Sequence, residues 1–286
     1  MMDHRSRAPG PAWDREFARR SPMFAPLQAV AEKLPAIGWP NTEVLDHVAA
    51  VSGRRIVNAR GERLRFVPAP ASGAAVDFES GTYHRSEVQV RPINWHDLLN
   101  ALVWMSFPTV KAVLNARHVE AIDAEAGGPR SSVRDALTHF DEDGVIVLSA
   151  DPELSALLRD FAWKELFWRR RQEVRSRMRF LLLGHALYEK ALRPFVGMTG
   201  KALLFDVSAP LIAQPVAAQC AYADRVAAVH LLDARNLLRP RELQPLPLLG
   251  VPGWWPDNEA EAFYDNSNYF RPGRQAAAAA EGRPAG

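Results

Sequence analysis

Apolar residues recur three and four positions apart in several long stretches of the chain, and this spacing is typical of amphipathic helices. It predicts helices at 22–34, 41–51, 94–107, 108–118, 151–171 and 215–234. Short apolar runs at 178–183 and 201–207 have instead the length of buried strands. Together these stretches predict an α+β fold, a helix-rich single domain with a small sheet.

Two segments predict β-hairpins. Residues 54–68 flank a turn at 59–61, and residues 136–148 flank the sequence Asp-Glu-Asp-Gly at 141–144, in which Asp-Gly favours a tight turn. Residues 83–91 are expected to be extended and to lead into the helix that begins after Asn94.

Three segments near the ends of the chain differ from the rest in composition. Residues 1–20 are charged and contain proline, which predicts a flexible N-terminal arm, and the alanine-rich residues 273–286 predict a disordered tail. Residues 240–272 carry many prolines and aromatic residues without periodicity. Because so apolar a segment is unfavourable in water, we expect it to wrap around the domain and bury its rings. Residues 21–272 would then form one globular domain with an extended C-terminal wrap.

The stretch 94–118, NWHDLLNALVWMSFPTVKAVLNARH, places polar residues at helical spacing inside an apolar pattern. Asn94 is a good N-cap, and Asp97 follows three residues later, where a carboxylate faces the positive end of the helix. Pro108 ends this first helix and suits the first position of a second one. The sequence therefore predicts two helices joined at a tight corner.

Each of these two helices carries a row of polar residues. His96 and Asn100 lie one turn apart on the first helix, and Lys111, Asn115 and His118 follow one another on the second. If the rows face each other, they form a pocket that binds a metal ion or moves a proton. The structural alternative is a buried network in which these side chains tie helix ends to neighbouring loops.

Further candidates lie later in the chain. His185 follows a glycine at the end of a predicted strand, and Glu189 lies one helical turn on, so the two share a helix face. A junction between strand and helix is a frequent location for functional sites. Asp141 and Asp143 could add carboxylates to a metal site, although turn formation also explains Asp143.

These patterns predict three sets of residues. The expected catalytic residues are His96, Asp97, Asn100, His185 and Glu189. The expected substrate-binding residues are Lys111, Asn115 and Arg134. The expected metal ligands are His96, Asp97, His118 and Asp135.

The segment 159–179 has a different character, because it contains eight lysines and arginines, against three acidic residues, with aromatic residues between them. A basic and aromatic helix can bind a phosphate backbone. The structural alternative is a solvated charged face whose rings turn into the core.

Composition adds few constraints. The net charge of +2 gives no overall field, and Cys220 as the single cysteine excludes an intrachain disulfide and a cysteine-rich metal site, which fits a reducing cytoplasm. No apolar run suits a signal peptide or a membrane span. We therefore expect a soluble cytoplasmic protein.

Four motifs also carry a resemblance to a known family. The stretch 94–118, RDALTHFDEDG (134–144), GHALYEK (184–190) and LPLLGVPGWWPDN with the following FY and FRP (246–272) resemble the proteobacterial domain-of-unknown-function family 3025. The resemblance covers most of the chain from about residue 20 to residue 272. It implies a soluble bacterial protein, and it lends no activity, substrate or catalytic residue.

The leading functional hypothesis is a metal-assisted hydrolase acting on phosphoesters, with one divalent ion held at the helix that begins after Asn94. In this hypothesis Lys111 binds the anionic substrate and Glu189 serves as the base. The alternative is a non-catalytic interaction protein, or a nucleic-acid-binding protein, that uses the basic segment 159–179.

Overall fold

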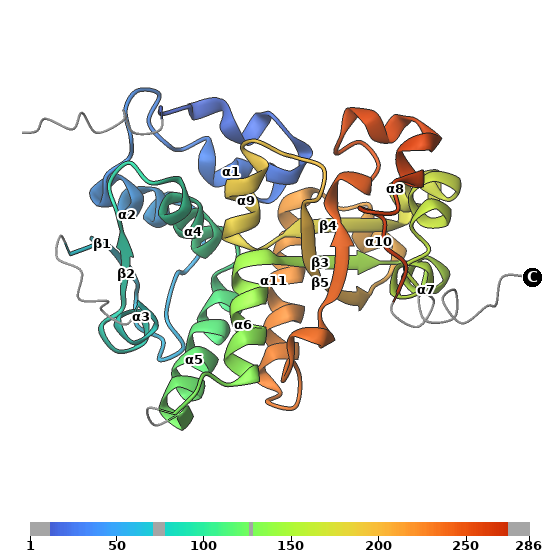
Figure 1. The fold of residues 1–286 in the computed structure, drawn as a ribbon. Helices are drawn as coiled ribbons and strands as arrows, with labels where there is room; N and C mark the ends of the chain where they lie inside the picture. The colour runs from blue at the N-terminus through green and yellow to red at the C-terminus, as the bar shows by residue number, and fades with distance from the viewer. Residues whose placement is uncertain (1–11, 71–77, 126–127, 274–286) are drawn as a thin grey trace, which may run out of the picture.

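A computed structural model describes residues 12–70, 78–125 and 128–273, and it has the helix-rich α+β fold that the pattern predicts (Figure 1). The helices are α1 (Gln28–Ala31), α2 (Thr42–Val51), α3 (Phe78–Arg85), α4 (Trp95–Ser106), α5 (Pro108–Glu125), α6 (Ser132–Asp143), α7 (Pro152–Arg159), α8 (Arg171–Arg177), α9 (His185–Ala191), α10 (Ala209–Ile212) and α11 (Val216–Leu232). The strands are β1 (Arg65–Pro68), β2 (Glu87–Val90), β3 (Gly144–Ser149), β4 (Met178–Leu182), β5 (Thr199–Asp206) and β6 (Gln244–Pro247).

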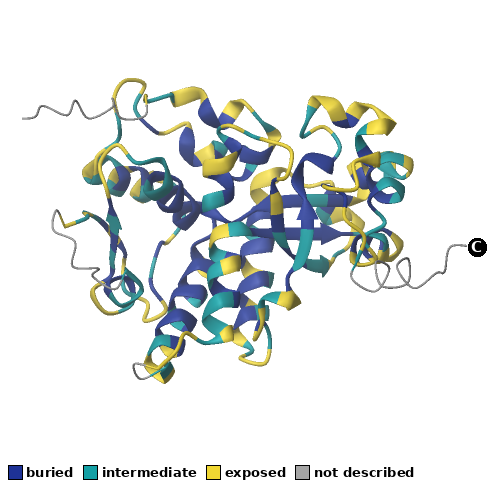
Figure 2. Ribbon diagram, in the orientation of Figure 1, coloured by how far each residue is buried: buried dark blue, intermediate teal, exposed yellow. Residues whose placement is uncertain are grey.

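The centre of the core is a four-stranded mixed sheet in the order β4-β3-β5-β6. Strand β3 pairs parallel to β5 and antiparallel to β4, and β6 pairs antiparallel to β5. Every residue of β3 is buried, as expected for a strand covered on both faces. Figure 2 shows the buried residues concentrated along this sheet and on the sides of the helices that face it. One continuous apolar cluster links these elements.

The hairpin predicted at 54–68 is right only next to its turn, because most of its second arm pairs elsewhere. Strand β1 lies parallel to β2, with Arg65 opposite Glu87, and the predicted hairpin keeps only an isolated bridge between Val57 and Arg63. The Asp46 carboxylate on α2 accepts from the backbone N–H of Phe66 at 2.9 Å, which holds β1 beside α2. The expectation of an extended segment at 83–91 holds only for β2, since residues 83–85 are the last turn of α3.

The hairpin predicted around residues 141–144 is wrong, because its first arm is helix α6. Ser131 caps this helix by accepting from the Arg134 backbone N–H, and Leu137 and Phe140 are buried at helical spacing. Strand β3 follows without a loop. A Cβ atom at Gly144 would lie 2.1 Å from the Phe140 carbonyl oxygen, so only glycine permits this direct change from helix to strand.

The long helix predicted at 151–171 begins as expected and then breaks. Asp151 caps α7 and Pro152 is its first residue, but α7 ends at Arg159. Phe161 then has a φ of 59°, and a π-helical turn at Glu165–Arg169 precedes α8. The Trp163 indole donates to the Arg271 carbonyl at 2.8 Å, so packing against the C-terminal segment stabilises the break.

The C-terminal wrap is confirmed. Tyr264, Tyr269 and Phe270 are buried, and the fully buried Asn258 side chain donates to two backbone carbonyls of the same segment. The N-terminal arm is ordered where the structure describes it: residues 15–19 form a 3₁₀ turn with Phe17 fully buried. Residues 1–11 of the expected arm and 274–286 of the expected tail lie outside the described residues.

Among the described residues, no helix has both the length and the apolar character needed to cross a bilayer.

Candidate functional site

Helix α4 begins as its sequence predicts. The Asn94 side chain accepts from the Asp97 backbone N–H at 2.9 Å, and Pro108 opens α5 directly after the corner at Phe107. The Asp97 carboxylate accepts three hydrogen bonds from Arg91, one from the backbone at 2.8 Å and two from the guanidinium at 2.8 and 2.7 Å. Burial alone would raise the pKa of Asp97, but these bonds hold it below its ordinary value. These contacts of Asp97 with Arg91 and Asn94 therefore stabilise the first turn of α4.

His96 forms a close pair with His185 of α9. The two Nε2 atoms lie 3.0 Å apart, and the rings meet edge to face at 81° with centroids 4.5 Å apart. On its other side, His96 Nδ1 lies 2.9 Å from Glu189 Oε2. The prediction that His185 and Glu189 share a helix face is confirmed, since both contact the same imidazole.

A glycine places His185 beside a second carboxylate. A Cβ atom at Gly184 would lie 2.3 Å from the Glu142 carbonyl oxygen, so only glycine allows the end of β4 to approach the junction of α6 and β3 so closely. His185 Nδ1 consequently lies 3.6 Å from Asp141 Oδ2, an ion-pair distance that is too long for a hydrogen bond.

The other Asp141 oxygen is held by Lys111. The Lys111 ammonium lies 2.5 Å from Asp141 Oδ1 and 5.4 Å from the centre of the Trp104 ring. These contacts complete a continuous row of five side chains, in which the inner three are largely buried and the outer two are more exposed. The row is Lys111 (3% exposed), Asp141 (13%), His185 (8%), His96 (34%) and Glu189 (47%).

Burial and charge set the protonation states of the inner part of the row. Burial alone would raise the pKa of Asp141, but the Lys111 ammonium and the His185 imidazole lower it to about 2. Burial lowers the pKa of His185 to about 4, although the Asp141 charge opposes this change. At neutral pH, Asp141 is therefore a carboxylate and His185 is a neutral imidazole.

Both ring nitrogens of His96 have a partner: Nδ1 faces Glu189 Oε2 and Nε2 faces His185 Nε2. His185 Nδ1, by contrast, is buried without a hydrogen-bond partner among the described residues. A proton placed on this nitrogen would face Asp141 Oδ2. The row is thus suited to receive and release a proton.

Of the remaining predicted catalytic and substrate-binding residues, the side chains of Asn115 and Arg134 bind other residues of the described chain, whereas that of Asn100 does not. Asn100 is buried, and its side-chain oxygen lacks a hydrogen-bond partner among the described residues. The Asn115 amide donates to the backbone carbonyl and the carboxylate of Glu79, and Arg134 pairs with Glu125 at 2.9 Å. The two polar rows therefore do not face each other directly; the row from α4 reaches Lys111 only through His185 and Asp141.

The structure does not bring the four predicted metal ligands together. Asp97 is bound to Arg91, and Asp135 pairs with Arg130 at 2.5 Å on the surface. His118 is buried near Asp141, and burial lowers its pKa to about 4. Within 12–70, 78–125 and 128–273, no group of three or more histidines, cysteines or carboxylates is arranged to hold a metal ion.

Asp141 is the member of the row that is missing from the three predicted sets, although the sequence offered it as a possible carboxylate of a metal site. The sequence contained a signal for it, because Asp141 follows Leu137 by four positions and Phe140 by one, within the apolar face of α6. A carboxylate inside a buried helix face needs a partner. The hairpin interpretation concealed this signal by assigning Asp141 to a turn.

Most of the basic residues of segment 159–179 are paired with carboxylates. Arg169 pairs with Glu165, and both Arg171 and Arg175 pair with Glu259 of the C-terminal segment. The other basic residues with carboxylate partners are Lys164, Arg170 and Arg177. Trp163 and Phe167 are buried, so their rings are not available to stack on bases.

The profile of a family described as proteins of unknown function (DUF3025) matches residues 64–274. A search of curated proteins and a search of solved structures found no match. The matched region contains all five side chains of the row from Lys111 to Glu189. Because it also spans most of the 286 residues, this chain belongs to the DUF3025 family.

Proposed function

We propose that this chain is a hydrolase in which Glu189, together with the His96–His185 pair behind it, activates water by general acid–base chemistry. The observation that carries the proposal is the arrangement of the pair: the two Nε2 atoms lie 3.0 Å apart, and each Nδ1 faces a carboxylate. Side chains of this type are the usual donors and acceptors of protons in enzymes, and a positioned pair contributes roughly 10²–10⁴ to a rate.

Glu189 is the member of the row that water can reach, because its side chain is 47% exposed and its Oε2 lies 2.9 Å from His96 Nδ1. As the oxygen of a water molecule bonds to the substrate, the proton that this water loses can move to Glu189 and be shared with His96. The same proton then goes to the leaving group as its bond to the substrate breaks.

We propose an anionic substrate, a phosphoester, on the basis of Arg91. Lys111, the expected anion-binding residue, is buried and bound to Asp141, so it is not placed to bind substrate. Arg91 is 58% exposed and lies beside the site. Its guanidinium binds Asp97, the residue after His96, which keeps Arg91 near the outer end of the row. Hydrogen bonds to Asp97 raise the pKa of Arg91, and the Glu189 charge adds to this rise.

A metal-assisted form of the same reaction remains a proposal. Metal-bound imidazoles commonly carry a carboxylate behind the second ring nitrogen, and both histidines have one. In that form His96 and His185 would hold the ion, and the ion would supply the activation of water.

Hydrolysis of chromogenic phosphomonoesters, phosphodiesters and carboxyesters tests the proposal. His96→Gln and His185→Gln are expected to lose at least about 10²-fold in kcat/KM, while His139→Gln, at an exposed position on α6, is the matched control and should keep wild-type activity. If no ester is hydrolysed, or if both site variants remain active, the hydrolase proposal is rejected.

Elemental analysis of purified, untagged protein beside His96→Ala separates the two forms of the reaction. A stoichiometric divalent metal that disappears in the variant supports the metal-assisted form. Activity without such a metal supports the proton-transfer form.

The alternative is a non-catalytic interaction protein. Its nucleic-acid form is less well supported, because the carboxylate partners described above offset most of the charge of segment 159–179. Binding of a fluorescent duplex that weakens steeply with salt would support it.

A further inference from the structure

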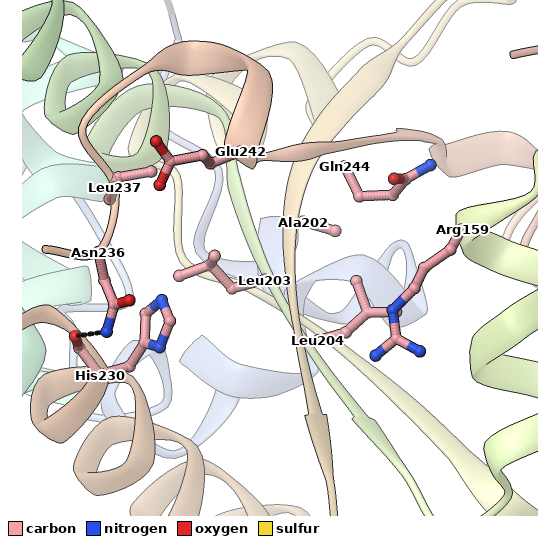
Figure 3. A pocket seen from close by; sticks show the side chains of 9 residues that line it. All are labelled: Arg159, Ala202, Leu203, Leu204, His230, Asn236, Leu237, Glu242 and Gln244. Atoms are coloured by element: carbon pink, nitrogen blue, oxygen red, sulfur yellow. Dashed lines mark hydrogen bonds between the residues drawn. The ribbon is translucent and has the colours of Figure 1, made fainter. Parts of the chain in front are cut away.

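A hollow of about 310 Å³ lies beside the outer part of the main sheet, and it shares no residue with the histidine site. Figure 3 shows Arg159 on one side of this hollow, His230 and Asn236 on the other, and Leu203 and Leu204 of β5 between them. Its size falls at the small end of the range for ligand pockets, about 300–1,000 Å³. An apolar floor with a few polar groups around it is also typical of such pockets.

Arg159 is a cation that no residue in the described part of the chain pairs with. It is the last residue of α7, and its guanidinium forms no ion pair or hydrogen bond with any described residue. Most of the other basic residues up to Arg179 are bound to carboxylates, so Arg159 differs from its neighbours. The Gln244 side chain donates to the Leu158 carbonyl at 3.1 Å and thereby ties β6 to the end of α7 beside Arg159.

The opposite wall is a tightly held loop after α11. Arg117, which is buried, donates to the carbonyls of Leu231 and Asn236 at 3.2 and 2.9 Å. Leu237 is buried with a φ of 56°, a conformation that is strained for any residue except glycine. Strained backbone is often found where a loop is shaped for a ligand.

The polar groups around the hollow favour one negative charge on a ligand. His230 packs edge to face on Phe205 at 5.7 Å, and burial lowers the pKa of its imidazole, so at neutral pH it offers a hydrogen bond without a charge. Glu242 also lines the hollow and accepts from the backbone N–H groups of Leu238 and Arg239. One guanidinium opposed by one carboxylate disfavours a dianion such as a phosphate monoester.

We infer that this hollow binds a small monocarboxylate with an apolar body, in which Arg159 holds the carboxylate and Leu203 and Leu204 contact the apolar part. The guanidinium matches a planar carboxylate with two parallel hydrogen bonds. The His230 imidazole can donate one further hydrogen bond to the carboxylate. This inference does not rest on the proposed hydrolase activity.

Saturation-transfer NMR with benzoate as the probe tests the inference, with benzyl alcohol as its neutral counterpart. Benzoate is expected to bind with a millimolar Kd, and benzyl alcohol should bind at least about tenfold more weakly. Arg159→Gln should weaken benzoate about tenfold or more, because it removes a charged donor pair. Arg169→Gln, another exposed arginine, is the matched control and should leave the Kd unchanged.

Two further measurements separate this site from other sources of binding. His230→Phe keeps an aromatic ring on Phe205 and removes the polar atoms, so it should weaken benzoate less than Arg159→Gln does. His96→Gln should leave benzoate binding unchanged. The inference is overturned if benzoate does not bind, if Arg159→Gln binds it as wild type does, or if inorganic phosphate displaces it more strongly than acetate does.

Discussion

The buried pair between Lys111 and Asp141 gives a prediction whose magnitude follows from the structure. Lys111→Met keeps most of the side-chain volume and removes the ammonium, which leaves the Asp141 carboxylate buried without its cation. Removing one partner of a buried ion pair destabilises a protein by about 3–5 kcal/mol. The low pKa of Asp141, about 2 against an ordinary 3.8, corresponds to an interaction of the order of 2 kcal/mol. The contact of the ammonium with Trp104 contributes about 1 kcal/mol more.

We therefore expect Lys111→Met to lower the free energy of unfolding at pH 7 by about 3 kcal/mol, measured by urea denaturation. Lys190→Met is the matched control, since its ammonium pairs with Asp143 at 2.7 Å on the surface. An exposed pair contributes only about 0–1 kcal/mol. The double variant Lys111→Met/Asp141→Leu should recover most of the loss, because it removes the unpaired charge as well.

The histidine beside the pair supplies an independent measurement. Lys111 lowers and Asp141 raises the pKa of His185, so removing the ammonium should move this pKa upward from about 4. An NMR titration of the imidazole in Lys111→Met would follow the change. The reasoning is refuted if Lys111→Met loses less than about 1 kcal/mol, or if the double variant is less stable than the single one.

Three further predictions concern pH, backbone packing and the outer end of the row. The pKa of His118 is about 4 in the folded protein against an ordinary 6.5, so between these pH values the unfolded chain binds more protons than the folded one. The free energy of unfolding therefore falls as the pH drops from 6.5 to 4. In His118→Gln, denaturation curves at the two pH values should show a fall that is smaller by about 3 kcal/mol. Gly184→Ala should lower the free energy of unfolding by more than about 3 kcal/mol, because the new Cβ would lie 2.3 Å from the Glu142 carbonyl oxygen. In the control Gly38→Ala the Cβ has open space, so the loss should be about 1 kcal/mol, from the positive φ alone. Glu189→Gln should change the Tm little but should lower kcat and alter its pH profile; an unchanged profile would contradict the proposed role of Glu189.

Local features of the site could be predicted from the sequence because they depend on residues close in the chain. The Asn94 cap and the shared face of His185 and Glu189 each need only the geometry of one helix turn. The start of α5 at Pro108 follows from the fixed φ of proline. Each of these predictions is confirmed.

The contacts that join these features could not be predicted in the same way. His96 and His185 lie 89 positions apart, and their meeting depends on how β4 pairs with β3 and on the absence of a side chain at Gly184. The two polar rows were expected to face each other because their helices are consecutive. Instead, Asn115 turns to Glu79, and only Lys111 reaches the row, through Asp141.

Asp141 shows how a local signal can point to the wrong structure. The dipeptide Asp143-Gly144 favours a turn, but the buried Leu137 and Phe140 gain more by completing the apolar face of α6 than a hairpin would gain from its turn. Tertiary packing thus decided the structure of the segment. The same packing turns Asp141 inward, where it needs Lys111.

The gradient of exposure along the row bears on whether the row is structural or functional. Its inner half, Lys111 and Asp141, is buried and strongly coupled, so joining α5 to α6 explains it fully. Its outer half is half-exposed, and the contact between His96 and Glu189 can add little stability, because exposed pairs contribute about 0–1 kcal/mol. A network that only linked helices would gain almost nothing from extending to the surface through two imidazoles. A row that exchanges protons with a bound substrate needs that extension, together with a buried inner half that holds its charges in place.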